Sequence, residues 1–221
     1  MASIAVEPPK EGDMVPAARV EIAIENASFD SKEIPENTLV RDVPGWTLAG
    51  YNTAMLREGS YISAVDGSNF MQISWSGSSI SQELSDTFDA TADYQLAMDL
   101  GNSQYGNSVS GFEIRLWAGD TLLGNAALSA TQARESLGYG RWNTLTLNVD
   151  GQVHQQASGK NLKVEVLNTG DENRDIVFVD NIRLAKLTGA MATFGDDPGS
   201  IDSRTSEGRY TIQPVLAPTV S

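Results

Sequence analysis

The chain has 221 residues and a mass of 23.7 kDa, enough for one large domain with a core of its own. Lys and Arg number 15 against 29 Asp and Glu, and the resulting net charge of −14 argues against nucleic acid or an anionic membrane as a partner. The absence of cysteine excludes disulfides and a thiol nucleophile. The single histidine, His154, excludes histidine-rich metal sites, and its polar surroundings predict a surface position.

Both ends of the chain lack a sustained hydrophobic period. We expect residues 1–18, which are rich in proline, to form an N-terminal tail and residues 189–221 to form a C-terminal tail. Residues 19–188 are predicted to be one domain. We see no signal peptide at the start and no apolar run long enough for a membrane span.

The domain is dominated by segments in which apolar and polar residues alternate, the pattern of a half-buried β-strand. In chain order these segments are residues 20–24, 94–100, 112–116, 145–149, 162–166 and 178–184. Short turn sequences separate the strands, among them Asp66-Gly67, Gly119-Asp120, Asp150-Gly151 and Thr169-Gly170-Asp171. The pattern predicts an all-β fold, an antiparallel two-sheet jelly-roll sandwich with extended tails.

One helix is predicted, from Ser129 to Gly138. Ser129 and Gln132 have the spacing of a capping box, and Gly138 stands where a helix C-cap is expected. This helix is expected to be an insertion between two strands.

Five phrases of the middle region resemble a known family when taken together. They are Asn-Ala-Ser-Phe-Asp at 26–30, Pro-Gly-Trp-Thr at 44–47, Asp-Gly-Ser-Asn at 66–69, Ser-Ile-Ser-Gln at 79–82 and Phe-Val-Asp-Asn-Ile-Arg-Leu at 178–184. In this order they resemble the galactose-binding-like jelly rolls of bacterial carbohydrate-binding modules, over about residues 20–187. The resemblance implies a domain that binds sugars or adheres to a surface, without catalysis.

An exposed aromatic side chain flanked by polar groups is typical of a sugar site. On the strand with Phe112, the opposite face presents Glu113, Arg115 and Trp117, and Trp75 follows another strand just before a polar loop. We therefore predict a ligand site at Trp117, Arg115, Glu113 and Trp75. In the alternative, Trp117 packs beneath a tail or against a neighbouring subunit.

The other two tryptophans are interpreted as structural. Trp46 follows Pro44-Gly45, where an indole can close one end of a β core, although a stacking platform is the functional alternative. Trp142 shares its side-chain parity with Thr144 rather than with Leu145, which places it either under a loop or half exposed.

Two aspartates suggest a cation site. Asp180 shares the parity of Ile182 and is expected to point inward, where a carboxylate needs a compensating charge or several N–H donors. Asp30 closes the phrase after the first strand, and the first and last strands of a jelly roll commonly lie side by side. Oxygen ligands suit Ca²⁺, and the resemblance also implies a structural calcium, held by Asp30 and Asp180. The alternative is that Asp180 accepts backbone N–H bonds with no metal present.

The sequence therefore predicts a non-catalytic carbohydrate- or surface-binding jelly-roll module, with a glycan or glycan-coated surface as its partner. The alternative is a structural component of an assembly, such as a virion decoration or fibre protein, whose tails clasp neighbouring subunits. Under either reading the protein is not an enzyme, and it is located outside the cell or on the surface of an assembly.

Overall fold

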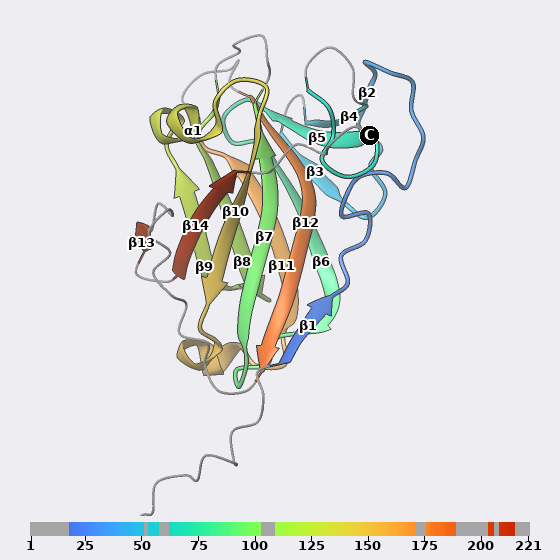
Figure 1. Cartoon of the computed structure of the whole chain (residues 1–221). Helices are drawn as coiled ribbons and strands as arrows, with labels where there is room; N and C mark the ends of the chain where they lie inside the picture. The colour runs from blue at the N-terminus through green and yellow to red at the C-terminus, as the bar shows by residue number, and fades with distance from the viewer. Residues whose placement is uncertain are drawn as a thin grey trace, which may run out of the picture.

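The structure is a computed structural model that describes residues 18–50, 53–57, 62–102, 109–170 and 176–188, and the backbone of residues 203–205 and 208–214. Two antiparallel β-sheets face each other in a sandwich (Figure 1), which confirms the predicted fold class. A helix, α1 (Ala130–Leu137), and a 3₁₀ helix, η1 (Gly151–Ala157), lie at opposite ends of the sandwich. Across these ranges, none of the helices has the length and apolar character that a membrane span requires.

The larger sheet has nine strands. They are β1 (Ala18–Ile22), β2 (Leu39–Val40), β4 (Ala54–Arg57), β5 (Asn69–Ser74), β7 (Asp93–Gly101), β10 (Trp142–Val149), β12 (Ile176–Thr188), β13 (Ser203–Thr205) and β14 (Gly208–Pro214). Their order is β13-β14-β10-β7-β12-β5-β4-β2, and β1 also pairs with β12. The first and last strands of the predicted domain therefore do run side by side.

The smaller sheet has five strands in the order β3-β6-β11-β8-β9. They are β3 (Thr47–Ala49), β6 (Ser79–Thr87), β8 (Phe112–Ala118), β9 (Thr121–Leu128) and β11 (Asn161–Asn168). Alternate residues of β8 and β11 are buried in the core, as predicted from the period of two.

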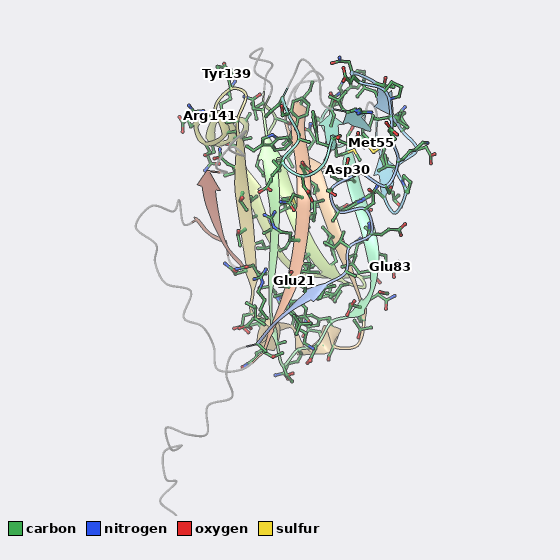
Figure 2. All side chains as sticks on the ribbon, turned by 45° about the vertical axis from the view of Figure 1, so that its right-hand side comes forward. Glu21, Asp30, Met55, Glu83, Tyr139 and Arg141 are labelled. Atoms are coloured by element: carbon green, nitrogen blue, oxygen red, sulfur yellow. The ribbon has the colours of Figure 1, made fainter. Side chains whose placement is uncertain are left out.

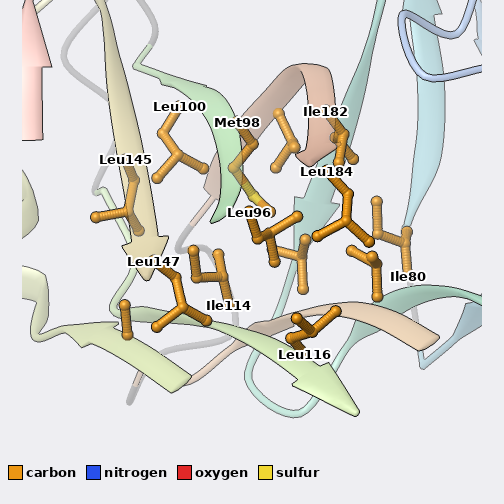
Figure 3. Packing of buried hydrophobic residues seen from close by; sticks show 14 of the residues in the cluster. Ile80, Leu96, Met98, Leu100, Ile114, Leu116, Leu145, Leu147, Ile182 and Leu184 are labelled. Atoms are coloured by element: carbon orange, nitrogen blue, oxygen red, sulfur yellow. The ribbon is translucent and has the colours of Figure 1, made fainter. Parts of the chain in front are cut away.

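The core lies between the two sheets and is built from inward-facing aliphatic side chains (Figure 3). Leu96, Met98 and Leu100 of β7 face Ile114 and Leu116 of β8 across the sandwich, and all five are buried. Burying an aliphatic side chain of this size stabilises a fold by about 1.5–3 kcal/mol. Packing between the sheets therefore holds this cysteine-free domain together.

The predicted helix is confirmed. Ser129 is the N-cap of α1, and the backbone N–H of Gln132 donates to its Oγ at 3.3 Å while the Gln132 side chain accepts from the N–H of Ser129 at 3.0 Å. Gly138 ends the helix with a φ of +62°, a value that glycine adopts without steric cost. The helix is an insertion between β9 and β10.

The segment predicted to reach a neighbouring subunit pairs with its own chain instead. β14 lies antiparallel to β10, with Leu145 opposite Ile212 and Leu147 opposite Tyr210. It covers the side of β10 that faces away from β7, and β13 then lies outermost. Residues 1–17, 189–202 and 215–221 of the predicted tails lie outside the described residues.

The expected surface position of His154 is wrong. This residue lies in η1 and is only 9% exposed. The 3₁₀ helix packs on the ends of β7 and β9, which buries the imidazole against the sandwich.

Candidate active site

A β-bulge in β12 determines the local geometry of the candidate site. Asp180 pairs with Asp99 of β7 and Arg183 pairs with Ala97, so two residues of β12 lie opposite one residue of β7. Asn181 absorbs the extra residue with a φ of +51°, a left-handed conformation that asparagine tolerates better than most residues. The bulge changes the direction of every side chain that follows it.

This change of direction was not predicted from the sequence. Ile182 and Leu184 point into the core between the sheets (Figure 3), whereas Phe178 belongs to a second apolar cluster. Asp180 follows Phe178 by two residues and lies on the same outer face, the face of the larger sheet turned away from the smaller one. Asp180 is buried as expected, but on the other side of the sheet from Ile182.

Three aromatic rings form the centre of the second cluster. The ring of Phe70 contacts Phe178 with a centroid distance of 4.9 Å and Trp142 with a centroid distance of 5.6 Å, both in edge-to-face geometry. Leu56 and Ile62 complete the cluster. Such aromatic pairs contribute about 0.5–1.5 kcal/mol beyond their buried area. The cluster is a rigid apolar surface made by β4, β5, β10, β12 and the segment before β5.

Trp142 lies under a loop, the first of its two predicted positions. Its Nε1–H donates to the carbonyl oxygen of Ser63 at 2.7 Å, and the residue is 9% exposed. The indole lies over Gly101 of β7, where an added Cβ would come within 2.6 Å of the ring. Gly101 therefore provides the space that the indole occupies.

The carboxyl group of Asp180 lies beside this aromatic cluster and is 0% exposed. Oδ2 accepts from the backbone N–H groups of Val65 at 2.7 Å and Asp66 at 3.1 Å, and Oδ1 accepts from the N–H of Asn181 at 2.7 Å. Burial raises the pKa of Asp180 to about 7 against the opposing effect of these hydrogen bonds, and the nearby charge of Asp30 raises it further. Asp180 can therefore hold a proton near neutral pH.

A second carboxylate, Asp99, lies next to Asp180 on the paired strand and is 2% exposed. It accepts from the Thr144 hydroxyl at 2.5 Å, from Asn181 Nδ2 at 2.8 Å and from the two terminal nitrogens of Arg183 at 3.2 and 3.3 Å. The guanidinium group compensates the charge of Asp99. The two neighbouring carboxyl groups thus have different surroundings.

Asp30 lies at the same end of the molecule as β4 (Figure 2). Its Oδ1 accepts from the N–H groups of Ser68 at 2.9 Å and Asn69 at 3.1 Å. Gly67, with a φ of +71°, has no room for a Cβ because the Asp30 carboxylate occupies that space. Asp30 and Asp180 therefore accept hydrogen bonds from neighbouring residues of one turn, and a metal shared by the two carboxyl groups stays a prediction.

The turn between the two aspartates offers several oxygen atoms. The Nδ2 of Asn69 donates to the carbonyl oxygens of Phe29 and Lys32 at 3.0 and 3.1 Å, while Asn69 Oδ1 is buried and lacks a hydrogen-bond partner among the described residues. In the described part of the chain, no three His, Cys, Asp or Glu side chains gather in a metal-binding group. Any cation here would depend on carbonyl and amide oxygens near Asp30.

The predicted ligand site on the smaller sheet is a network of internally paired groups. Arg115 donates to Glu113 at 2.7 Å and to Glu165 at 3.3 Å, and the indole N–H of Trp117 donates to Glu165 at 3.1 Å. Burial alone would raise the pKa of Glu113, but its bonds to Arg115 and Asn125 lower it overall. The carboxylates and the terminal guanidinium nitrogens are therefore engaged within the sheet itself, whereas Arg115 Nε is buried without a hydrogen-bond partner among the described residues.

Lys163 lies over the ring of Trp117, 4.7 Å from its centroid, and covers the proposed stacking surface. Trp75 occupies the turn between β5 and β6, whereas Trp117 pairs with Lys163 further along β11. Trp46 is buried, with its ring 5.5 Å from that of Phe29, as the structural interpretation predicted.

Of the residues that the outer face brings together, Asp180 was singled out from the sequence as a candidate metal ligand, whereas Asp99 and Trp142 were not assigned to a site. The signal for Trp142 was present, since its parity placed it away from the core, and Asp99 has the outward parity of its strand. What the alternation could not reveal is the segment from Ile62 to Asp66, which lies against Trp142 and Asp180.

The described geometry defines an all-β protein with a buried, protonatable carboxyl group beside an aromatic cluster, a combination suited to chemistry on an apolar small molecule. Residues 20–185 match the family described as HpiC1-like, HpiC1 cyclase. The chain therefore belongs to this family of cyclases. No curated protein sequence matches it.

Three solved structures share the fold. The Stig cyclase FisC from Fischerella sp. TAU, in complex with (3Z)-3-(1-methyl-2-pyrrolidinylidene)-3H-indole, is 22% identical with a TM-score of 0.65, covering 76% of this chain and 98% of its own. A cyclase from the same organism is 22% identical with a TM-score of 0.66, over 79% and 100% of the two chains. A cyclase in complex with 4-(1H-indol-3-yl)butan-2-one is also 22% identical, with a TM-score of 0.63, over 78% and 100%.

These comparisons correct the functional predictions. The carbohydrate-binding-module identity is wrong, and so are the non-catalytic function and the statement that the protein is not an enzyme, because the family consists of cyclases. The predicted glycan partner and the virion or adhesion alternative are wrong as well, since the related structures hold small indole compounds. The five phrases belong to a sandwich that different functions share.

Proposed function

We propose that this protein is a cyclase that closes a ring in a small apolar substrate bearing an indole group, with Asp180 as the proton donor. The observation that carries the proposal is the buried carboxyl group of Asp180 beside Phe70, Trp142 and Phe178, within the region that matches the cyclase family. The indole compounds in the related cyclases support the substrate class.

The chemistry requires one proton and no other reactant. Protonated Asp180 transfers its proton to an unsaturated carbon of the substrate and becomes a carboxylate held by the N–H groups of Val65, Asp66 and Asn181. The resulting carbocation is attacked by the substrate's own π bond, which closes the ring. Loss of a proton to the Asp180 carboxylate restores the acid, so substrate and product have the same mass.

The aromatic cluster serves this chemistry in two ways. Ring faces attract a developing positive charge, and an apolar wall keeps out water that would otherwise trap the cation. Because Asp180 and the three rings are buried beneath the segment from Ile62 to Asp66, substrate entry requires this segment to move. Two of its bonds to Asp180 and one to Trp142 must break during opening.

Turnover tests the proposal directly. The protein is incubated with a panel of indole-bearing alkenes, and chromatography with mass spectrometry detects a product of unchanged mass and altered retention. Asp180→Asn should abolish this product, whereas Asp93→Asn, which removes a carboxylate at the opposite end of the same sheet, should retain it. Equal turnover by the Asp180 variant and the wild type would refute the assignment.

Binding provides a second test, with 4-(1H-indol-3-yl)butan-2-one as the probe. Trp142→Phe should weaken binding by about tenfold through loss of indole contact in the site. Trp117→Phe is the matched control on the other sheet and should bind as the wild type does. The reverse ranking of these two variants would place the ligand on the smaller sheet.

We also propose a structural calcium ion at Asp30, where carboxylate, carbonyl and amide oxygens lie close together. Asp30 uses only Oδ1 for the turn amides, and the Phe29 and Lys32 carbonyls with the Asn69 amide oxygen supply the neutral ligands that Ca²⁺ accepts. Asp180, the second ligand predicted from the sequence, is left out of this ligand set because its oxygens already hold three N–H groups.

Thermal unfolding with and without chelator tests the calcium proposal. An ion at one hundred times its dissociation constant stabilises the native state by about 2.7 kcal/mol, or about 5–10 °C in melting temperature for a domain of this size. EDTA should therefore lower the melting temperature and Ca²⁺ should restore it, with no response in Asp30→Asn. Asp120→Asn, in the turn between β8 and β9, should respond as the wild type does. If EDTA leaves the melting temperature of the wild type unchanged, the proposed calcium ion is wrong.

A further inference from the structure

The bulge in β12 connects the two buried carboxyl groups through a single residue. The backbone N–H of Asn181 donates to Asp180 Oδ1 at 2.7 Å, and the side-chain Nδ2 of the same residue donates to Asp99 Oδ2 at 2.8 Å. Asn181 thus donates to both carboxyl groups, once from its backbone and once from its side chain. The backbone direction of Asn181 is therefore tied to Asp99.

Asp99 is itself held firmly. Thr144 of β10 donates to its Oδ1, and Arg183 of β12 bonds both of its oxygens, so three strands meet at this carboxylate. Its 2% exposure leaves little room for movement. A charge-assisted cluster with this many donors is a fixed point from which a neighbouring residue can be oriented.

Asn181 needs such support because its conformation is unfavourable. A non-glycine residue at a φ of +51° carries strain that the surrounding structure must over-determine, and such residues concentrate at functional sites. In this conformation the N–H of Asn181 donates to the carboxyl group of Asp180. The strain thus has a local consequence, which is the direction of one N–H group.

We propose that Asn181, anchored by Asp99, is a positioning residue that holds the carboxyl group of Asp180 in place for proton transfer. The proposal rests on the proposed function of Asp180 as the acid. Asn181 itself donates to the carboxyl group and not to the substrate. A positioning group of this kind is needed because an acid must be held within about 0.5 Å of its productive position.

The test uses Asn181→Gly in the full chain. Glycine keeps the backbone N–H and adopts the positive φ without strain, so this variant removes only the side-chain bond to Asp99. Lys186→Met is the matched control, because it breaks the bond between Lys186 and Asp89 near the other end of the same strand.

Amide hydrogen exchange gives a readout that does not require turnover. The N–H groups of Val65 and Asp66 bond directly to Asp180, so loosening this carboxyl group should raise their exchange rates by about tenfold, the effect of weakening one hydrogen bond. The amide of Ala133 in α1 should remain within twofold of the wild type. Unchanged Val65 and Asp66 amides, or an equal increase at all three, would overturn the proposal.

A double-mutant cycle on turnover tests whether Asn181 acts through Asp180 or independently of it. Asn181→Gly should lower kcat by about tenfold with little change in KM, and should have no further effect in the Asp180→Asn background. A multiplicative effect in that background would show that Asn181 acts independently of Asp180. If Asp180→Asn keeps full activity, the proposed function fails, while the exchange result still decides whether Asn181 holds the carboxyl group.

Discussion

Gly101→Ala tests the packing of the candidate site most sharply. A methyl group at this position would lie 2.6, 2.7 and 2.8 Å from three atoms of the Trp142 six-membered ring, closer than non-bonded carbon atoms approach. The indole must therefore shift, which strains its bond to Ser63 and its edge contact with Phe70. Overpacking of this kind costs about 1–3 kcal/mol, or about 2–12 °C in melting temperature for a domain of this size.

The assay is a double-mutant cycle by thermal or urea unfolding, with probe binding measured on the same samples. In the Trp142→Phe background the smaller ring relieves the clash, so Gly101→Ala should lower the free energy of unfolding much less there than in the wild type. Binding of 4-(1H-indol-3-yl)butan-2-one should fall with Gly101→Ala in the wild-type background. An equal stability cost in both backgrounds, or unchanged probe binding, would refute the packing argument.

Three further changes have defined outcomes. The bond from Lys186 lowers the pKa of Asp89, so this pair stabilises the native state above the ordinary aspartate pKa of about 3.9, and this stabilisation is lost as the pH falls. In urea titrations, Lys186→Met should therefore lose less free energy of unfolding than the wild type between pH 5 and pH 2. Burial raises the pKa of Asp180, so wild-type stability should fall as the pH rises from about 4 to about 7, and Asp180→Asn should lack this slope. Arg115→Met should lower the melting temperature by leaving Glu113 without its ion pair, while probe binding stays at the wild-type level.

The fold could be predicted because its causes are local. Alternation along the strands fixes which side chains enter the core, and the Ser129 capping box with Gly138 fixes the helix ends. The prediction failed where the alternation is interrupted. Asn181 inserts one residue into β12, and a bulge of this kind leaves no mark in a pattern of apolar and polar residues.

The candidate site could not be predicted because contacts distant in the sequence create it. The aromatic cluster joins Phe70, Trp142 and Phe178 from three strands, and its cover comes from the segment before β5. Trp117 has the expected direction, but Lys163 and Glu165 from the neighbouring strand occupy its ring face and its N–H. Strand pairing decides such neighbours, and composition does not reveal it.

The family prediction failed for a related reason. Phe29, Trp46 and Gly67, which stand in the phrases that suggested carbohydrate-binding modules, serve the core and one tight turn. Residues of this kind specify a sandwich, and a sandwich can carry either a binding site or a catalytic one. Asp180 lies in the same set of phrases, and its chemistry became visible only through its burial and its hydrogen bonds.

The pH dependence of kcat for ring closure is the measurement that tests the central claim most directly. If protonated Asp180 starts the reaction, kcat should be highest below pH 7 and fall as the pH rises through about 7, where this carboxyl group loses its proton. A kcat that is constant from pH 5 to pH 9 would contradict the account. So would a kcat–pH profile in Asp180→Asn that falls with the same midpoint as in the wild type.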